Sequence, residues 1–194
     1  MIAPVDIEAF EREVRRGGVV VFPTDTVYGI GCGSDQPAAI ERLHELKGRP
    51  AEKPSALMWF SRAAALAALG HLDARTRGAV ERLLPGPVLA VVTGPDGGTL
   101  GVRVPRLEGV LEPLAEARVV VMQTSANLTG GPDPRRLADV PEKLLTGADL
   151  VLDGGELPGL ASTVVDLTDY HEGRWAVLRE GAVDQAALVE LLES

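Results

Sequence analysis

Two segments of the sequence combine hydroxyl, amide and carboxylate side chains with glycines, a mixture that suits the binding of small charged molecules. The first is PTDTVYGIGCG over residues 23–33, and the second is TSANLTGG over residues 124–131. Each follows a run of valines typical of a buried strand, and ligands of α/β proteins collect at the carboxyl ends of strands. The same residue types also dominate ordinary turns, so either segment by itself supports only a loop. Their occurrence after two core strands favours a binding site.

The run Lys47-Gly48-Arg49-Pro50 holds two cations that can bind an anion. On a continuous helix these two side chains would face nearly opposite sides. We expect Gly48 to end the helix and Pro50 to move Arg49 out of helical conformation, which lets both cations meet one polyphosphate. Each charged hydrogen bond would then contribute roughly 1.5–3 kcal/mol. Cations also stabilise a helix C-terminus without any ligand, and this run leaves that alternative open.

Other signatures of cofactor and metal binding do not occur in the sequence. Gly29, Gly31 and Gly33 form G-x-G-x-G, which is not the dinucleotide fingerprint, and there is no G-x-x-x-x-G-K-[ST] phosphate loop. The single cysteine excludes an internal disulfide and a cysteine-rich zinc module. The three histidines are far apart and have no carboxylate at ligand spacing. We therefore expect no metal site built by the protein.

The composition indicates one globular domain over residues 1–194. The chain is 45% hydrophobic and 24% charged, enough for a core and an ordinary surface. The acidic N-terminus lacks the pattern of a signal peptide, and no apolar run approaches the roughly 20 residues of a membrane span. We expect a cytoplasmic protein without membrane contact. The net charge of −9 argues against general nucleic-acid binding but leaves a local basic cleft open.

Helical and extended patterns alternate along the chain. Helices are expected at 6–17, 37–47, 62–70, 74–84, 107–117 and 185–192, with caps at Asp6, Ser61, Asp73 and Asp184. Strands are expected at 18–22, 55–60, 88–92, 99–105, 118–123, 149–153, 162–167 and 174–180. Because several of these strands are continuous valine-rich runs, we predict an α/β fold with a mixed sheet covered by helices.

Eight short motifs follow one another along most of the chain, from about Gly17 to Gly181. They are FPTDTVYGIG, ELKGRP, LLPGP, GVRVP, TSANLTG, LDGG, STVVD and LREG. In order and spacing they resemble the YrdC-like family of threonylcarbamoyl-AMP synthases, in its short, single-domain form. The K-x-R and S-x-N signatures joined to PTDTVYG make the resemblance specific.

The resemblance implies a twisted, mostly mixed α/β sheet with a large concave cleft, and a nucleotidyltransferase activity. Members of the family join L-threonine, bicarbonate and ATP into L-threonylcarbamoyl-AMP and pyrophosphate, with Mg²⁺ bound with the nucleotide. The product supplies N6-threonylcarbamoyladenosine formation in tRNA. A short form implies separate proteins that transfer the threonylcarbamoyl group to tRNA.

The resemblance also assigns roles to residues of this chain. The catalytic set, which also holds ATP phosphates, consists of Lys47, Arg49, Ser125 and Asn127. Further nucleotide contacts are expected from Thr99 and Arg179. L-Threonine is expected to contact Thr26, Tyr28, Arg103 and Ser162, with Arg103 pairing with its carboxylate. Asp25 is expected to organise its loop instead of acting as a general base.

Three positions depart from the family's pattern. Met58 stands where some longer members have a histidine that contacts threonine. Leu89 and Arg135 stand where threonine, and serine or threonine, are common. These departures affect secondary contacts and leave the catalytic set intact.

Two rival functions stay open. The first is a binding module for double-stranded RNA or tRNA, and a weak tRNA contact is also compatible with the synthase. The second is carbamoyl transfer, as in hydrogenase-maturation carbamoyltransferases that contain a similar domain. Those proteins are much longer and carry acylphosphatase-like and zinc-finger regions that this sequence lacks.

Overall fold

The computed structural model describes residues 4–48 and 56–193, and within them nine strands form one mixed sheet. The strands are β1 (Val20–Pro23), β2 (Tyr28–Gly33), β3 (Ala56–Met58), β4 (Val88–Thr93), β5 (Thr99–Arg103), β6 (Val121–Ser125), β7 (Leu150–Val151), β8 (Thr163–Asp166) and β9 (Ala176–Arg179). Their order in the sheet is β7-β1-β2-β6-β3-β5-β4-β8-β9. Three neighbouring pairs are parallel and five are antiparallel, so the predicted mixed sheet is confirmed.

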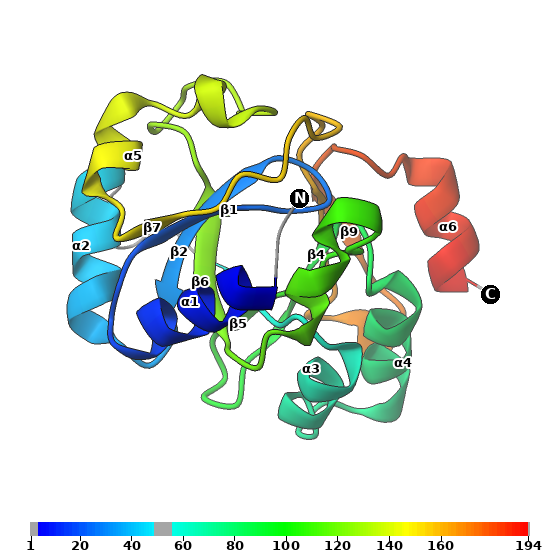
Figure 1. The fold of residues 1–194 in the computed structure, drawn as a ribbon. Coiled ribbons are helices and arrows are strands. Elements are labelled where there is room, and N and C mark those ends of the chain that lie inside the picture. The colour runs from blue at the N-terminus through cyan, green and yellow to red at the C-terminus, as the bar shows by residue number, and fades with distance from the viewer. Residues whose placement is uncertain (1–3, 49–55, 194) are drawn as a thin grey trace.

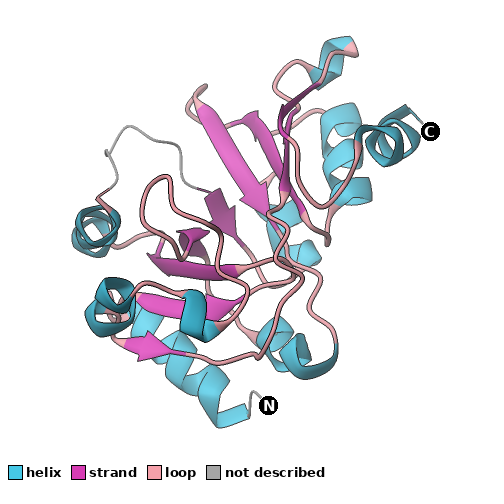
Figure 2. Cartoon of the chain, turned by 90° about the horizontal axis from the view of Figure 1, so that it is seen from above, coloured by secondary structure: helices cyan, strands magenta, loops and turns pink. Residues whose placement is uncertain are grey.

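Helices flank both ends of this sheet (Figure 1). They are α1 (Pro4–Arg15), α2 (Pro37–Lys47), α3 (Arg62–Ala68), α4 (Ala74–Leu83), α5 (Glu142–Gly147) and α6 (Gln185–Glu193). Three 3-10 helices are η1 (Gly109–Glu116), η2 (Leu137–Asp139) and η3 (Tyr170–Glu172). Helix α2 packs against α5 at one end, and α4 packs against α3 and α6 at the other. Figure 2 shows that the strands nearest the N-terminus run across the direction of those nearest the C-terminus, so the sheet is strongly twisted.

Two hydrophobic cores lie along the sheet, one for each group of helices. In the first, Phe10 on α1 meets Phe22 and Phe60 edge to face, with ring centroids 5.3 and 5.5 Å apart. The second core joins α4 and α6 to β4 and β8 through side chains such as Val165 and Leu188. Burial of these aromatic and aliphatic side chains is the main stabilising term for the fold. Between the cores, the sheet carries the polar residues described below.

The strand β2 is the one strand that the sequence pattern did not predict. Residues 28–33 were expected to continue a polar loop, but they pair with both β1 and β6 as a fully buried strand. A Cβ atom at Gly31 would come within 2.5 Å of Val121 Cγ1 and 2.7 Å of the Met122 carbonyl oxygen. The alternating glycines therefore allow close strand packing, which a search for loop residues misreads as flexibility.

The helix predictions are confirmed in position and corrected in detail. Asp73 caps α4 by accepting hydrogen bonds from the backbone of Arg75 and Thr76, and Asp184 accepts one from Ala187 at the start of α6. Asp6 does not cap α1, because this helix already begins at Pro4. Ser61 stands at the N-cap of α3 without a side-chain capping bond. The segment 107–117 forms the 3-10 helix η1, which contains Pro113, and α5 was not foreseen.

Candidate functional site

A cavity of about 440 Å³ lies against the sheet and is lined from both halves of it. Its lining comes from the β1–β2 turn, from strands β2, β3, β4, β5, β6, β8 and β9, and from the segment just before β8. Seven of the ten residues expected at the site line this cavity: Thr26, Tyr28, Thr99, Arg103, Ser125, Ser162 and Arg179. Residues far apart in the chain therefore meet at this cavity.

The two polar segments singled out in the sequence meet at one edge of the sheet. Strand β1 ends at Pro23, which pairs with Tyr28, while Gly29 on β2 pairs with Ser125 at the end of β6. The amide of Ala126 donates to the Tyr28 carbonyl at 2.8 Å and holds the second segment against the first. The expectation that both segments lie at equivalent strand ends is confirmed.

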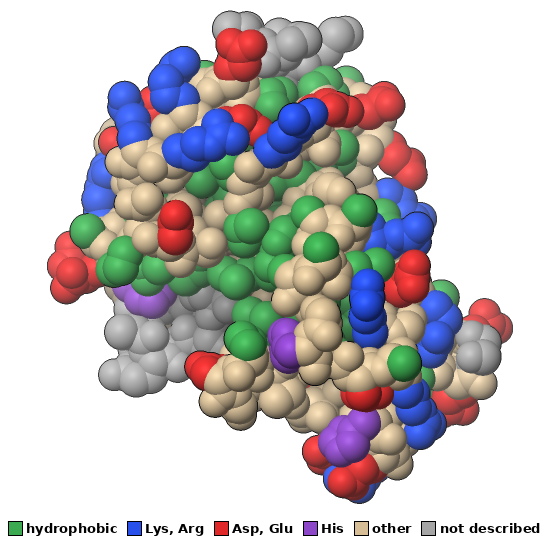
Figure 3. All heavy atoms as spheres, turned by 90° about the horizontal axis from the view of Figure 1, so that it is seen from below, with side chains coloured by type: hydrophobic (Ala, Val, Ile, Leu, Met, Phe, Trp, Pro, Cys, Tyr) green, Lys and Arg blue, Asp and Glu red, His purple; other side chains and the backbone are tan. Residues whose placement is uncertain are grey.

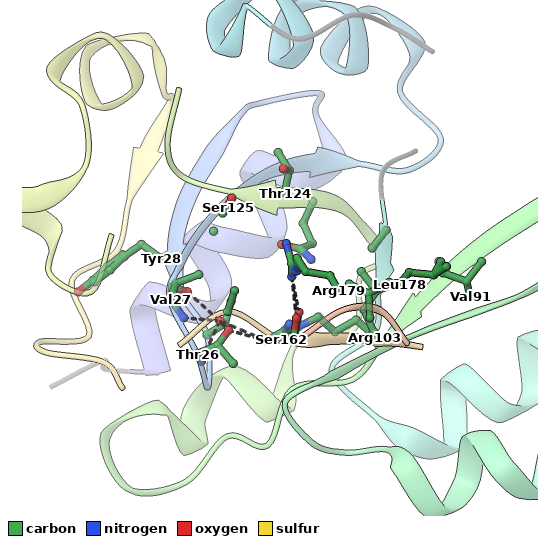
Figure 4. A pocket seen from close by; sticks show the side chains of 18 of the residues that line it. Thr26, Val27, Tyr28, Val91, Arg103, Thr124, Ser125, Ser162, Leu178 and Arg179 are labelled. Carbon is green, nitrogen blue, oxygen red and sulfur yellow. Dashed lines mark hydrogen bonds between the residues drawn. The ribbon is translucent and has the colours of Figure 1, made fainter. Parts of the chain in front are cut away.

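Arg103 is held at the centre of a buried polar cluster (Figure 4). Its Nη2 donates to Asp25 Oδ1 at 2.5 Å and to Thr26 Oγ1 at 2.8 Å, and lies 3.5 Å from Thr24 Oγ1. The other oxygen of Asp25 accepts the backbone N–H of Arg106 at 2.9 Å. Asp25 therefore organises the turn, as expected, and also pairs with the arginine that was assigned to the substrate carboxylate.

The Arg103 guanidinium lies in an environment that favours a further anion. Burial, the largest cause, lowers its pKa from the ordinary value; the Asp25 carboxylate opposes the shift and the positive charge of Arg179 adds to it. Arginine nonetheless stays protonated in proteins. Its Nε is buried and has no hydrogen-bond partner among the described residues. Leaving a buried charged donor unpaired is costly, so an anionic ligand at this point would be stabilised.

Lys47 forms a second cationic centre at the end of α2. The helix ends there because Gly48 adopts a left-handed conformation with φ of 59°. The Lys47 ammonium is buried and donates to the Ser125 carbonyl and to Asn127 Oδ1, the latter at 3.2 Å; it lies 3.4 Å from Thr124 Oγ1. These contacts go well beyond a helix-end charge in solvent, so the alternative of helix stabilisation by itself does not describe Lys47.

Ser125 and Asn127 join Lys47 in one network. The Ser125 hydroxyl donates to Asn127 Oδ1 at 2.8 Å, and Asn127 Nδ2 donates to the Gly131 carbonyl at 2.7 Å. A smaller hollow of about 270 Å³ lies over this network. Its lining shares Thr124, Ser125 and Arg179 with the larger cavity, so the two spaces adjoin.

The remaining predicted residues differ in placement. Arg179 Nη2 donates to the Ser162 carbonyl at 2.7 Å and to its Oγ at 3.3 Å, which brings the expected nucleotide and threonine contacts together. Thr99 is exposed on the lining of the cavity. Arg49 lies outside the described residues, so its convergence with Lys47 stays a prediction.

The Tyr28 hydroxyl points away from the Arg103 cluster, as Figure 4 shows. It donates toward Asp153 Oδ1 at 2.8 Å and lies 2.9 Å from the Gly155 carbonyl, and the Gly154 amide donates to it at 3.0 Å. The side chain is fully buried. The hydroxyl therefore anchors the 153–155 loop. Tyr28 also lines the cavity, so its contact with threonine stays a prediction.

We expect Tyr28→Phe to lower the free energy of unfolding by about 1–3 kcal/mol, since loop groups lose a buried partner. Burial, the largest cause, raises the Tyr28 pKa from 10 to about 12. Because the pKa of Tyr28 is higher in the folded protein than in the unfolded chain, the protonated hydroxyl stabilises the fold. This stabilisation is fully present below pH 10 and is lost as the pH rises through about 12. Denaturant titrations below pH 10 and near pH 12 should show a smaller alkaline loss in the variant. An equal loss in both proteins would contradict this assignment.

The three departures from the family pattern lie in different environments. Met58 is fully buried in the first core, and Leu89 lines the cavity as an apolar wall. Arg135 forms an exposed ion pair with Glu156 at 2.7 Å. The lining also includes polar residues that were not among the predicted site residues, such as Gln123 and Asp166. Gln123 follows the valine-rich run that leads into β6 and Asp166 ends β8, so in each case a polar side chain that interrupts a valine-rich run was the available signal.

Among residues 4–48 and 56–193, no three His, Cys, Asp or Glu side chains gather as metal ligands would. Within the same ranges, no helix has the length and apolar character needed to cross a bilayer.

The chain resembles proteins of one family over most of its length. The Sua5/YciO/YrdC family model, described as telomere recombination, matches residues 12–181. The threonylcarbamoyl-AMP synthase of Pyrococcus abyssi is 32% identical over 167 residues, which cover 81% of this chain and 49% of that protein. The threonylcarbamoyl-AMP synthase of Xanthomonas campestris is 37% identical over 176 residues, covering 80% of this chain and 89% of that protein.

The fold agrees with this similarity. A solved structure of P. abyssi Sua5 complexed with L-threonine matches with a TM-score of 0.85 and 28% identity, over 99% of this chain and 58% of that one. The chain therefore spans about half the length of the P. abyssi synthase and most of the length of the X. campestris protein.

Proposed function

The chain belongs to the Sua5/YciO/YrdC family, and from that membership we propose that it is an L-threonylcarbamoyl-AMP synthase. It joins L-threonine, bicarbonate and ATP into L-threonylcarbamoyl-AMP and pyrophosphate, and is thus a nucleotidyltransferase. The observation that carries the proposal is the presence of two buried cations, Arg103 and Lys47, at two adjoining cavities. One suits an amino-acid carboxylate and the other suits a polyphosphate.

The amino-acid half of the site is built around Arg103. A guanidinium can hold Asp25 and Thr26 through Nη2 and still donate to a second carboxylate through another nitrogen, whereas a lysine has only one nitrogen for all its donors. Thr26 Oγ1 lies 2.8 Å from Arg103 Nη2, and Ser162 lines the same cavity, so both hydroxyls are proposed to contact this carboxylate or the neighbouring amine. The L-threonine complex of the P. abyssi relative supports this choice of amino acid.

The nucleotide half is built around Lys47, Ser125 and Asn127. In the described structure the Lys47 ammonium already has protein acceptors, so a phosphate oxygen must replace at least one of them. The Ser125 hydroxyl, now bound to Asn127 Oδ1, would then be available to the same phosphate. We propose that the nucleotide is also contacted by Arg49, Thr99 and Arg179.

The reaction requires the substrates to be held close together and the phosphate charge to be neutralised, and it requires no nucleophile from the protein. The threonine amine and bicarbonate give a carbamate with loss of water. A carbamate oxygen then forms a bond to the α-phosphorus while the bond from that phosphorus to the bridging oxygen breaks, and pyrophosphate leaves. Arg103 holds the amino acid in place, and Lys47 stabilises the charge that develops on the leaving group.

We propose that Mg²⁺ enters with the nucleotide, where it would neutralise phosphate charge. This fits the donor set, because Mg²⁺ usually keeps several waters and binds through substrate phosphates instead of an all-protein cage. The product would pass to separate proteins that transfer the threonylcarbamoyl group to tRNA. A cytoplasmic location follows from such a role.

The proposal is tested by pyrophosphate release from purified protein given ATP, Mg²⁺, bicarbonate and one amino acid at a time. We expect release that requires L-threonine and bicarbonate together, and mass spectrometry should find L-threonylcarbamoyl-AMP. Release that ignores the amino acid would refute the proposal. ATP cleavage that depends on carbamoyl phosphate would instead favour carbamoyl transfer.

The RNA-binding alternative is tested by the salt dependence of tRNA binding. On the face seen in Figure 3, basic side chains lie beside acidic ones and do not form one continuous basic surface. Together with the net charge of −9, this disfavours strong phosphate-driven affinity. Tight tRNA binding with a steep salt slope, and no pyrophosphate release, would favour the alternative.

A further inference from the structure

Asp25 has a role at the site that exceeds the organisation of its own turn. Its side chain is 7% exposed, and it is the acidic partner in the described structure that pairs with the 4% exposed side chain of Arg103. One oxygen accepts from the guanidinium and the other accepts the backbone N–H of Arg106. The carboxylate therefore links the guanidinium to the backbone that follows β5.

The hydrogens of the guanidinium are divided between protein and cavity. Arginine has five N–H hydrogens, two of them on Nη2. Asp25 and Thr26 accept from Nη2 at 2.5 and 2.8 Å, which uses both. Nε has no partner among the described residues, and no bond from Nη1 to them is present either. The hydrogens of Nη1 therefore remain available, and an oxygen of a ligand carboxylate can accept from them.

We propose that Asp25 is a positioning residue: it anchors Arg103 through Nη2 so that Nη1 stays available to the carboxylate of the amino-acid substrate. The inference rests on the proposed function. The competing effect is electrostatic, since the Asp25 charge also repels a carboxylate. We expect positioning to outweigh repulsion, because an arginine fixed before binding does not lose its side-chain freedom when the substrate arrives.

Two substitutions separate positioning from charge balance. Asp25→Asn keeps one acceptor, but its amide group must face either Arg103 or the Arg106 N–H, both of which are donors. Asp25→Glu keeps the charge and lengthens the side chain by one methylene group, which moves the anchor. A role limited to neutralising Arg103 would be rescued by Glu, whereas a positioning role would not.

The matched control is Asp149→Asn. Asp149 likewise accepts from a backbone N–H, that of Val19 at 2.8 Å, and from an arginine, Arg42 at 2.7 Å. It lies outside both cavities. Asp149→Asn therefore removes a carboxylate that joins an arginine to a backbone N–H, as Asp25→Asn does, but at a position away from the cavities.

The experiment measures KM for L-threonine and for ATP, together with thermal unfolding, for all four proteins. We expect both Asp25 variants to raise the KM for threonine about tenfold and to leave the KM for ATP unchanged. The reason is that threonine binding must then immobilise the Arg103 side chain, which Asp25 holds in the unsubstituted protein. Asp149→Asn should leave both constants unchanged. An unaltered threonine KM in either folded Asp25 variant, or a parallel rise in the ATP KM, would overturn the inference. Absence of threonine-dependent turnover in the unsubstituted protein would instead refute the proposed function.

Discussion

Lys47→Met is expected to lower kcat/KM for ATP by about 10²–10³-fold, the loss seen when one preorganised charge-stabilising donor is removed. The Lys47 ammonium is buried beside Ser125 and Asn127, where water does not screen it as it would a surface charge. Methionine keeps the length and apolar character of the side chain but offers no charge to the phosphates. The measurement is threonine-dependent pyrophosphate release over a range of ATP concentrations.

The fold should survive this change. Asn127 Oδ1 still accepts from Ser125 in the variant, so we expect a stability loss of only about 1 kcal/mol. The control is Lys143→Met, because Lys143 is exposed and lies 3.5 Å from the Glu45 carbonyl, away from either cavity. An active Lys47→Met protein with ordinary ATP kinetics would exclude Lys47 from the phosphate site.

Arg103→Lys is expected to raise the threonine KM by about 10–100-fold, since a charged hydrogen bond of roughly 1.5–3 kcal/mol to the substrate carboxylate is lost. Lysine keeps the charge that balances Asp25, so the buried pair is not left as an isolated carboxylate. Its three N–H hydrogens sit on one nitrogen, however, and Asp25 and Thr26 already occupy that position. Little remains for the substrate.

Alanine would be a poorer test at this position. Removing one partner of a buried ion pair costs about 3–5 kcal/mol, and loss of the fold would mimic loss of binding. The matched control is Arg106→Lys, whose side chain is exposed and reaches the Pro85 carbonyl at 3.3 Å. Calorimetry should show that threonine binds more weakly to the Arg103→Lys variant than to the unsubstituted protein, and equally well to the Arg106→Lys control. Equal affinities in the two variants would remove Arg103 from the carboxylate site.

The sequence was most informative where periodicity and residue type agreed. The eight predicted strands all have counterparts in the sheet, and α2 begins and ends at the predicted residues. Buried runs of valine and apolar residues at helical spacing are local signals, so no tertiary contact is needed to detect them. Single domain organisation over residues 1–194 remains a prediction from composition.

The errors have a common cause in tertiary packing. Residues 28–33 contain three glycines, which by propensity indicate a loop, yet the close approach of β6 requires glycine at position 31. The bonds of the Tyr28 hydroxyl to the 153–155 loop were likewise not predicted, because the direction of this side chain depends on the register of β2. Register shifts by one residue reverse the face of every side chain, and sequence periodicity does not determine it when a strand is buried on both faces.

The sequence by itself singled out the residue types that are proposed to carry the chemistry: two cations near a helix end, a Ser-x-Asn segment, an arginine on a strand, and a Thr-Asp-Thr turn. Only the tertiary structure decided which of them share a partner. Asp25 and Arg103 are 78 residues apart, and Lys47 is 80 residues from Asn127. Such contacts depend on strand order and sheet twist, which are properties of the whole sheet and have no local sequence signal.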